Sequence, residues 1–133
     1  MIFTNLKDNH ELYCFGHLTE GAVAYYQATG KDRLLKAAER FADFIASKLG
    51  HGEGKKAGYP GHEIAEMALM RLYDLTGEQK YLDLAKYFID ERGTKPYYYD
   101  IERGLTCPEG EERYSYNQAI PVSGQTMNWN LPL

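Results

Sequence analysis

The sequence contains few of the residues that stabilise disulfide-rich or metal-binding domains. Cysteine occurs only twice and histidine four times in 133 residues. Cys14 and Cys107 are far apart and no CxxC pair is present, so the cysteines make no disulfide framework. This cysteine usage is typical of a reducing compartment, and we predict a cytoplasmic protein.

Basic charge and long apolar runs are also scarce. The formal net charge is -4, whereas phosphate binding requires a clustered basic surface, so the composition argues against a nucleic-acid partner. No apolar run approaches the roughly 20 residues of a membrane span. The chain becomes polar within its first four residues, so neither a signal peptide nor a membrane partner is predicted.

The sequence does contain enough apolar material for one folded domain. Apolar residues make up 44% of the chain, and its length is sufficient to bury a core. Twelve residues are tyrosines. A tyrosine ring has a flat apolar face and a hydroxyl at its edge, which suits sugars and wet interfaces but also suits packing between helices.

Four segments have apolar residues at helical spacing and predict amphipathic helices. These segments are residues 10–28, 34–49, 62–75 and 79–91. Gly30 and Gly77 each follow a threonine at the end of the first helix of a pair, where glycine provides a left-handed C-cap. Asp8 and Glu11 resemble a capping box at the start of the first helix.

The two pairs of helices repeat each other at a fixed offset. Aligning Gly77 with Gly30 gives 77 − 30 = 47 residues. At this offset identical residues coincide at Tyr26/Tyr73, Thr29/Thr76, Leu35/Leu82, Ala38/Ala85, Phe41/Phe88 and Asp43/Asp90. We therefore predict an all-α fold of helical hairpins, at about residues 10–49 and 62–92. Such repeats stack into solenoids or close into toroids, because one hairpin cannot bury both of its faces.

The first helix of each pair is the less polar one, which favours an inner position in a toroid. Along residues 10–28 a stripe of small and histidine residues comprises His10, His17, Gly21, Ala24 and Ala28. Residues 93–133 lose the helical period and predict a long loop and a divergent tail. We therefore predict that residues 1–133 are a single segment of a larger toroid, whose exposed helix faces favour homo-oligomers.

Three of the four histidines lie at two predicted helix starts. His10 and His17 share one helical face, which fits either a polar ligand site or a capped helix with one satisfied histidine; spacing alone favours the second. His62 and Glu66 have the i, i+4 spacing of metal ligands, but the segment lacks the second histidine of HExxH. The turn at residues 58–61 aims His62 near a helix N-terminus.

Three stretches carry a resemblance to a known family. They are HELYCFGHLTEGAVAYYQATGKDRLLKAAERFADFI, GYPGHEIAEMALMRLYDLTGEQKYLDLAKYFIDERG and PYYYD. From about Phe3 to Asp100 the chain resembles the beta-L-arabinofuranosidase-type glycoside hydrolases. The resemblance implies a partial (alpha/alpha)6 toroid, in agreement with the hairpin repeat. It covers only a slice of the family's catalytic domain.

The resemblance also implies which residues contact a sugar. In the family, histidines from the N-terminal half of the barrel contact a terminal beta-L-arabinofuranoside, and His10 and His62 match them. The implied substrate-binding residues, with their neighbours, are His10, Glu11, His17, Tyr59, His62 and Glu63.

The chemistry of the family is placed elsewhere by the same resemblance. The family nucleophile is a cysteine thiolate held deprotonated by zinc, in a site of cysteines and a glutamate downstream of this region. Neither Cys14 nor Cys107 matches a zinc-site cysteine. We therefore predict no catalytic residue, metal ligand or cofactor in this chain, although the full-length family uses zinc. Binding of an arabinofuranoside-type sugar is expected to be weak or lost.

The prediction is thus a truncated glycoside hydrolase fragment that is inactive alone. One alternative is a non-enzymatic module that self-associates through its helices or binds carbohydrate weakly. A further alternative is another toroid-type sugar enzyme, such as an epimerase or an unsaturated-glycoside hydrolase. The HELY and GYPGHE motifs disfavour this last alternative.

Overall fold

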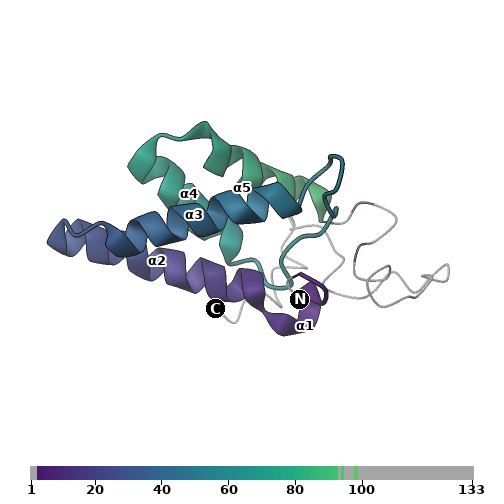
Figure 1. Cartoon of the computed structure of the whole chain (residues 1–133), viewed down its shortest axis with the longest axis horizontal. Coiled ribbons are helices and arrows are strands. Elements are labelled where there is room, and N and C mark those ends of the chain that lie inside the picture. The colour runs from purple at the N-terminus through teal and green to yellow at the C-terminus, as the bar shows by residue number, and fades with distance from the viewer. Residues whose placement is uncertain (1–2, 93, 95–97, 99–133) are drawn as a thin grey trace, which may run out of the picture.

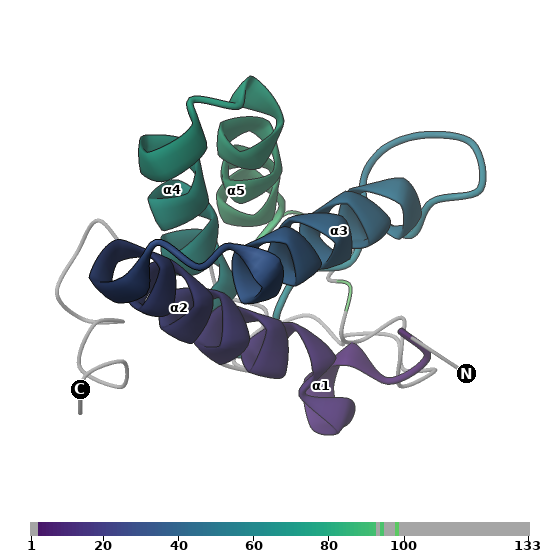
Figure 2. The same ribbon diagram turned by 60° about the vertical axis from the view of Figure 1, so that its left-hand side comes forward.

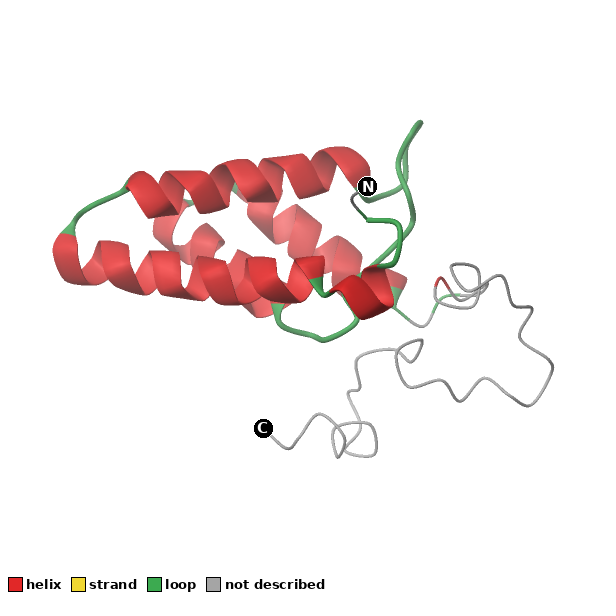
Figure 3. Ribbon diagram, turned by 60° about the horizontal axis from the view of Figure 1, so that its bottom comes forward, coloured by secondary structure: helices red, strands yellow, loops and turns green. Residues whose placement is uncertain are grey.

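The computed structural model describes residues 3–92, 94 and 98. Within this part the chain is helical and no strand forms; one isolated bridge pairs Leu49 with Lys56. The helices are α1 (Leu6–Asn9), α2 (Glu11–Thr29), α3 (Arg33–Lys48), α4 (Ala65–Thr76) and α5 (Gln79–Glu91). The predicted all-α fold is confirmed, and Figure 3 shows helices joined only by loops and turns.

Two helical hairpins make up most of the part of the chain that the structure describes. α2 and α3 run side by side, and α4 and α5 form a second pair next to them (Figures 1 and 2). α2 and α4 also pack directly against each other, so the first helices of the two pairs lie in the middle and α3 and α5 flank them. The largest fully buried apolar side chains are Phe3, Leu6, Leu12, Phe15, Ile45, Leu49, Tyr59, Leu69, Leu72 and Phe88.

The repeated Thr-Gly pair ends both central helices in the same way. Gly30 has φ 74° and Gly77 has φ 71°, and each donates its backbone N–H to the carbonyl four residues earlier at 2.7 Å. The hydroxyls of Thr29 and Thr76 each donate to a helix carbonyl and accept the N–H two residues later. A left-handed residue is easiest for glycine, which explains why the turn repeats with the 47-residue offset.

Two local predictions at the helix starts are wrong. The N-cap of α2 is His10, in the left-handed conformation at φ 57°, and no side chain caps the helix. Asp8 lies within α1 and is therefore not the N-cap of α2 that the capping box required. α4 begins at Ala65 rather than at residue 62, because the segment that contains Pro60 continues as bends and turns through Ile64.

A close approach joins the two hairpins near these starts. A Cβ added at Gly16 of α2 would lie 2.5 Å from Cγ2 of Ile64 and 3.1 Å from the backbone nitrogen of Ala65. Real Cβ atoms do not tolerate the shorter distance, so glycine at this position lets α2 and the start of α4 touch. By contrast, a Cβ at Gly21 would meet nothing within 4 Å.

The predicted loop and tail at residues 93–133 lie outside the described residues, apart from Thr94 and Tyr98. The ring of Tyr98 lies 6.0 Å from that of Tyr59. In the described part of the chain, no helix is both long enough and apolar enough to cross a membrane.

Candidate functional site

Four ring side chains gather where α2 begins. The rings of His10 and His62 are stacked, with centroids 5.6 Å apart and an interplanar angle of 21°. Tyr13 lies edge-on to both, at 5.8 Å from His10 and 5.4 Å from His62. The ring of His17 also contacts Tyr13, at 4.5 Å. We call these four residues the histidine cluster.

The helical spacing of α2 accounts for two members of the cluster, because Tyr13 and His17 stand four residues apart on one face. His10, the residue before the helix, joins them through its ring contact with Tyr13. His10 and His17 are exposed, and the side chain of Tyr13 is 37% exposed. The shared face that the spacing predicted for His10 and His17 is confirmed by the ring contacts.

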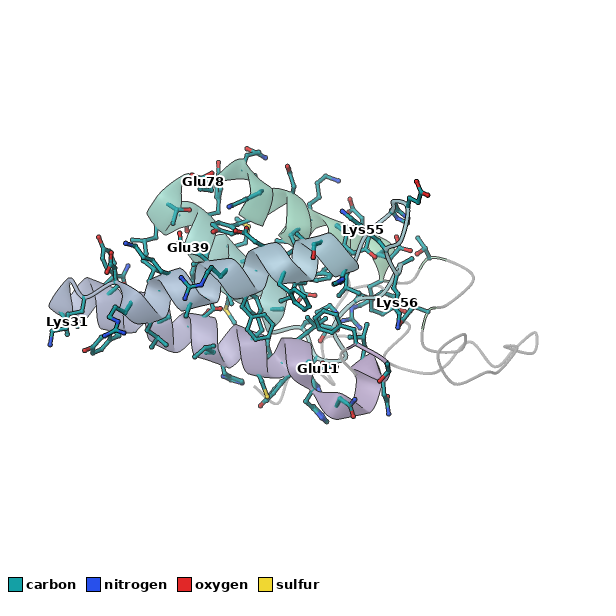
Figure 4. All side chains as sticks on the ribbon, viewed as in Figure 1. Glu11, Lys31, Glu39, Lys55, Lys56 and Glu78 are labelled. Carbon is teal, nitrogen blue, oxygen red and sulfur yellow. The ribbon has the colours of Figure 1, made fainter. Side chains whose placement is uncertain are left out.

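The residue after the first histidine binds the backbone of the N-terminal segment. The carboxylate of Glu11 accepts the backbone N–H of Phe3 through both oxygens, at 3.0 and 3.1 Å. Lys56 donates its ammonium to the carbonyl of the same Phe3 at 2.9 Å. Glu11 and Lys56 lie at the same end of the molecule, opposite Lys31 (Figure 4). The left-handed φ of His10 is unusual for a residue other than glycine, and such strain requires support from its surroundings.

The second histidine lies in a turn that α5 holds. The side chain of Arg92, the residue after α5, is fully buried. Its Nη2 donates to the carbonyl of Pro60, and its Nε lies 3.6 Å from a carboxylate oxygen of Glu63. Its guanidinium carbon sits 4.8 Å from the ring centroid of Tyr59, which is 1% exposed. Tyr87 of α5 donates its hydroxyl to the carbonyl of Gly58 at 3.0 Å.

A glutamate of α4 is buried close to this arginine. Glu66 is only 6% exposed, and neither of its carboxyl oxygens has a hydrogen-bond partner among the described residues. Burial raises the pKa of Glu66 to about 7, and the nearby charge of Arg92 opposes part of that rise. The carboxyl group is therefore largely protonated below neutral pH.

His62 is the member of the cluster whose titration is shifted. Burial lowers the pKa of His62, and the neighbouring His10 and Arg92 lower it further, while Glu63 opposes them. A lowered pKa keeps the imidazole neutral at pH 7. A neutral imidazole has one N–H donor and one nitrogen acceptor, which suits contact with hydroxyl groups.

The six residues that the sequence predicted as sugar contacts divide into two groups. His10, His17 and His62 join the cluster. Glu11 and Glu63 instead bind groups of the protein, and Tyr59 lies buried under Arg92. Sugar contact by all six stays a prediction.

Sequence reasoning missed three residues of this region. Tyr13 could have been found, because it shares the i, i+3, i+7 face with two histidines already selected. Arg92 gave no comparable signal, and Glu66 was noted only for its spacing to His62, because the importance of both residues comes from burial against other elements.

Nothing in the described part of the chain is arranged to hold a metal. No group of three or more His, Cys, Asp or Glu side chains lies close enough there to coordinate an ion. Cys14 is a free, exposed thiol on α2, and Cys107 lies outside the described residues. The donor set of a cysteine zinc site is therefore not found among these described residues.

The fold and the cluster define a segment of an alpha/alpha toroid, with a ring-lined surface where its central helices begin. A family model described as the beta-L-arabinofuranosidase, GH127 catalytic domain, matches residues 2–126. The chain belongs to this glycoside hydrolase family.

Individual relatives agree with this assignment. A non-reducing end beta-L-arabinofuranosidase of Bifidobacterium longum subsp. longum is 44% identical over 97 residues, which is 73% of this chain and 15% of that protein. The solved GH127 beta-L-arabinofuranosidase of Geobacillus stearothermophilus T6 superposes with a TM-score of 0.79 at 49% identity, over 89% of this chain and 20% of that one. A second GH127 beta-arabinofuranosidase structure gives 0.64 at 52% identity, over 66% and 14%. The chain thus spans only a small part of each relative.

Proposed function

We propose that this chain forms part of the sugar-binding wall of a beta-L-arabinofuranosidase and supplies neither the nucleophile nor a zinc ligand. The observation that supports the proposal most is the stacking of His10 on His62, 5.6 Å apart, from two hairpins. Two histidines that converge from distant parts of the sequence form a polar surface, which a single capped helix would not produce. The relatives named above are beta-arabinofuranosidases, which gives the class of sugar.

The cluster offers the contacts that a small furanose requires. The neutral imidazole of His62 can donate to one sugar hydroxyl and accept from another. Tyr13, whose ring contacts both His10 and His17, adds a partly exposed ring face for the apolar C–H groups of a sugar. In this proposal His10, His17 and His62 contact the sugar, while Glu11, Tyr59 and Glu63 lie beside or beneath them.

In this proposal the chain retains weak binding of the sugar and does not hydrolyse it. A direct test incubates it with 4-nitrophenyl beta-L-arabinofuranoside, zinc and a thiol reductant, and follows release of nitrophenol. We expect no release above the uncatalysed rate. Zinc-dependent release that disappears in a His10→Ala variant would overturn the inactive part of the proposal.

Binding is tested separately with methyl beta-L-arabinofuranoside, using saturation-transfer NMR on the sugar. We expect His10→Ala and His62→Ala to weaken the signal, because each removes a hydroxyl partner worth about 1 kcal/mol. His51→Ala is the matched control, since His51 lies in the loop after α3 and pairs with Glu91 at 2.7 Å. A wild-type signal equal to that of both cluster variants would count against the proposed site.

A second candidate function is self-association through exposed helix faces. Leu18 and Tyr25 of α2 are 39% and 43% exposed, and Met67 of α4 is 50% exposed. Large apolar side chains left on a surface favour association between copies when they lie close together. Light scattering at increasing concentration tests this candidate, and a constant monomer mass would exclude it. A cytoplasmic location stays a prediction.

A further inference from the structure

We infer that Arg92 is a positioning residue for the sugar site: its guanidinium clamps the turn at residues 59–63 and so presents His62 to His10. This inference rests on the proposed function for the role of the site. The clamp itself is a statement about geometry within the chain, and it can be tested without any sugar.

The contacts of Arg92 bracket His62 on both sides. Before the histidine, the guanidinium stacks on the ring of Tyr59 at 4.8 Å and donates to the carbonyl of Pro60. After it, the guanidinium pairs with Glu63 at 3.6 Å. One planar, buried group therefore holds the turn both before and after His62. A guanidinium can make these contacts together because its donors are fixed in a fork and its face stacks on aromatic rings.

His62 links this turn to the other hairpin. The turn lies between α3 and α4, and the half-buried ring of His62 contacts the rings of His10 and Tyr13 at the start of α2. Arg92, in contrast, follows the last residue of α5. The turn therefore connects the buried guanidinium after α5 to the ring contacts at the start of α2. Replacing the guanidinium should weaken those ring contacts.

The chain offers a matched pair of arginines for the test. Arg92→Lys keeps the positive charge but loses the fork and the stacking face. Arg71→Lys makes the same chemical change in an arginine of α4 that pairs with Glu20 at 2.5 Å and is 53% exposed. Both variants are studied as the full chain with labelled histidines, and nuclear Overhauser contacts from the ring of His62 to those of His10 and Tyr13 are measured.

We expect Arg92→Lys to lose the contacts of the His62 ring and to weaken binding of methyl beta-L-arabinofuranoside about tenfold, the loss of roughly one well-made hydrogen bond. Arg71→Lys should keep both the His62 ring contacts and the sugar binding. Unchanged His62 contacts in a folded Arg92→Lys variant would overturn the inference. If wild-type contacts are present but no sugar binds, the proposed function fails and the clamp is still judged by the ring contacts.

Glu63→Gln keeps the inference testable if Arg92→Lys does not fold. It removes one arm of the clamp and leaves the contacts to Tyr59 and Pro60 in place. We expect weakened His62 ring contacts and a further lowering of the His62 pKa, because Glu63 opposes that lowering in the wild type. Full-strength ring contacts would overturn the clamp, whereas the lowered pKa follows from the lost charge of Glu63 alone.

Discussion

The two His-Glu pairs, His10-Glu11 and His62-Glu63, use the same two residues with different supports. In both, the histidine joins the cluster and the glutamate binds another part of the protein. Glu11 accepts a backbone N–H from Phe3, whereas Glu63 pairs with the side chain of Arg92. A backbone donor is present in every residue except proline, but a side-chain donor can be removed by one substitution. The second pair should therefore be the more sensitive of the two to substitution of its partner.

The largest effect is expected from Arg92→Met, which removes the support of the second pair. The variant leaves Glu63 without its ion-pair partner in a partly buried setting, and breaking such a pair costs about 3–5 kcal/mol of unfolding free energy. Arg71→Met, in the more exposed pair with Glu20, should cost at most about 1 kcal/mol. Urea unfolding followed by circular dichroism measures both, and equal losses would show that burial of Arg92 has no special weight.

Glu66→Gln tests the raised pKa of the buried carboxyl group near Arg92. The folded pKa of Glu66 is about 7 against an ordinary value of 4.5, so the folded state binds its proton more tightly than the unfolded state. Stability from this group is therefore fully present below pH 4.5 and is lost as the pH rises through 7. The difference corresponds to about 3 kcal/mol. Glu66→Gln should raise the unfolding free energy at pH 8 by up to that amount and change it little at pH 4.

The pH dependence of the unfolding free energy distinguishes the effect of the buried Glu66 from that of removing any surface charge. Glu53→Gln, at an exposed loop position, removes the same charge and should shift stability equally little at both pH values. A Glu66→Gln variant that is less stable at pH 8 than at pH 4, relative to the wild type, would contradict the raised pKa.

Gly16→Ala tests the close contact between α2 and the start of α4, which joins the two helical hairpins. The added Cβ would meet Ile64 and the backbone of Ala65, and such overpacking costs about 1–3 kcal/mol. Gly21→Ala, five residues later on the same helix, adds its Cβ into open space and should stabilise by up to about 1 kcal/mol through helix propensity. Thermal unfolding of the two variants should move in opposite directions, and a shared direction would refute the close contact.

The smallest effect is expected from Glu11→Gln in the first pair. The amide oxygen can still accept the N–H of Phe3, so only the charge assistance of the hydrogen bond is lost, about 1 kcal/mol. In chemical denaturation, the unfolding free energy of this variant should be close to that of Glu53→Gln and well above that of Arg92→Met. A loss as large as that of Arg92→Met would remove the proposed difference between the two pairs.

Much of the fold could be predicted from local signals. The apolar spacing and the Thr29-Gly30 and Thr76-Gly77 turns depend on neighbouring residues, so the sequence alone predicted both hairpins and their central helices. The shared face of His10 and His17 followed from helical spacing in the same way.

The local backbone and the long-range contacts that position the histidine cluster could not be predicted from neighbouring residues. The left-handed backbone at His10 has no marker in the sequence, because glycine and asparagine are the usual signals for it. The role of Arg92 depends on how α5 packs against a turn about thirty residues earlier, which periodicity within one helix does not report. The late start of α4 reflects the continued turn after Pro60, where helical spacing had predicted an earlier beginning.

The most direct test of the central claim titrates the isotopically labelled chain with methyl beta-L-arabinofuranoside and follows the imidazole signals of all four histidines. We expect the signals of His10 and His62 to shift together along one saturation curve, while that of His51 stays unchanged. A titration in which the sugar shifts neither His10 nor His62, in a chain that retains its helices, would contradict it.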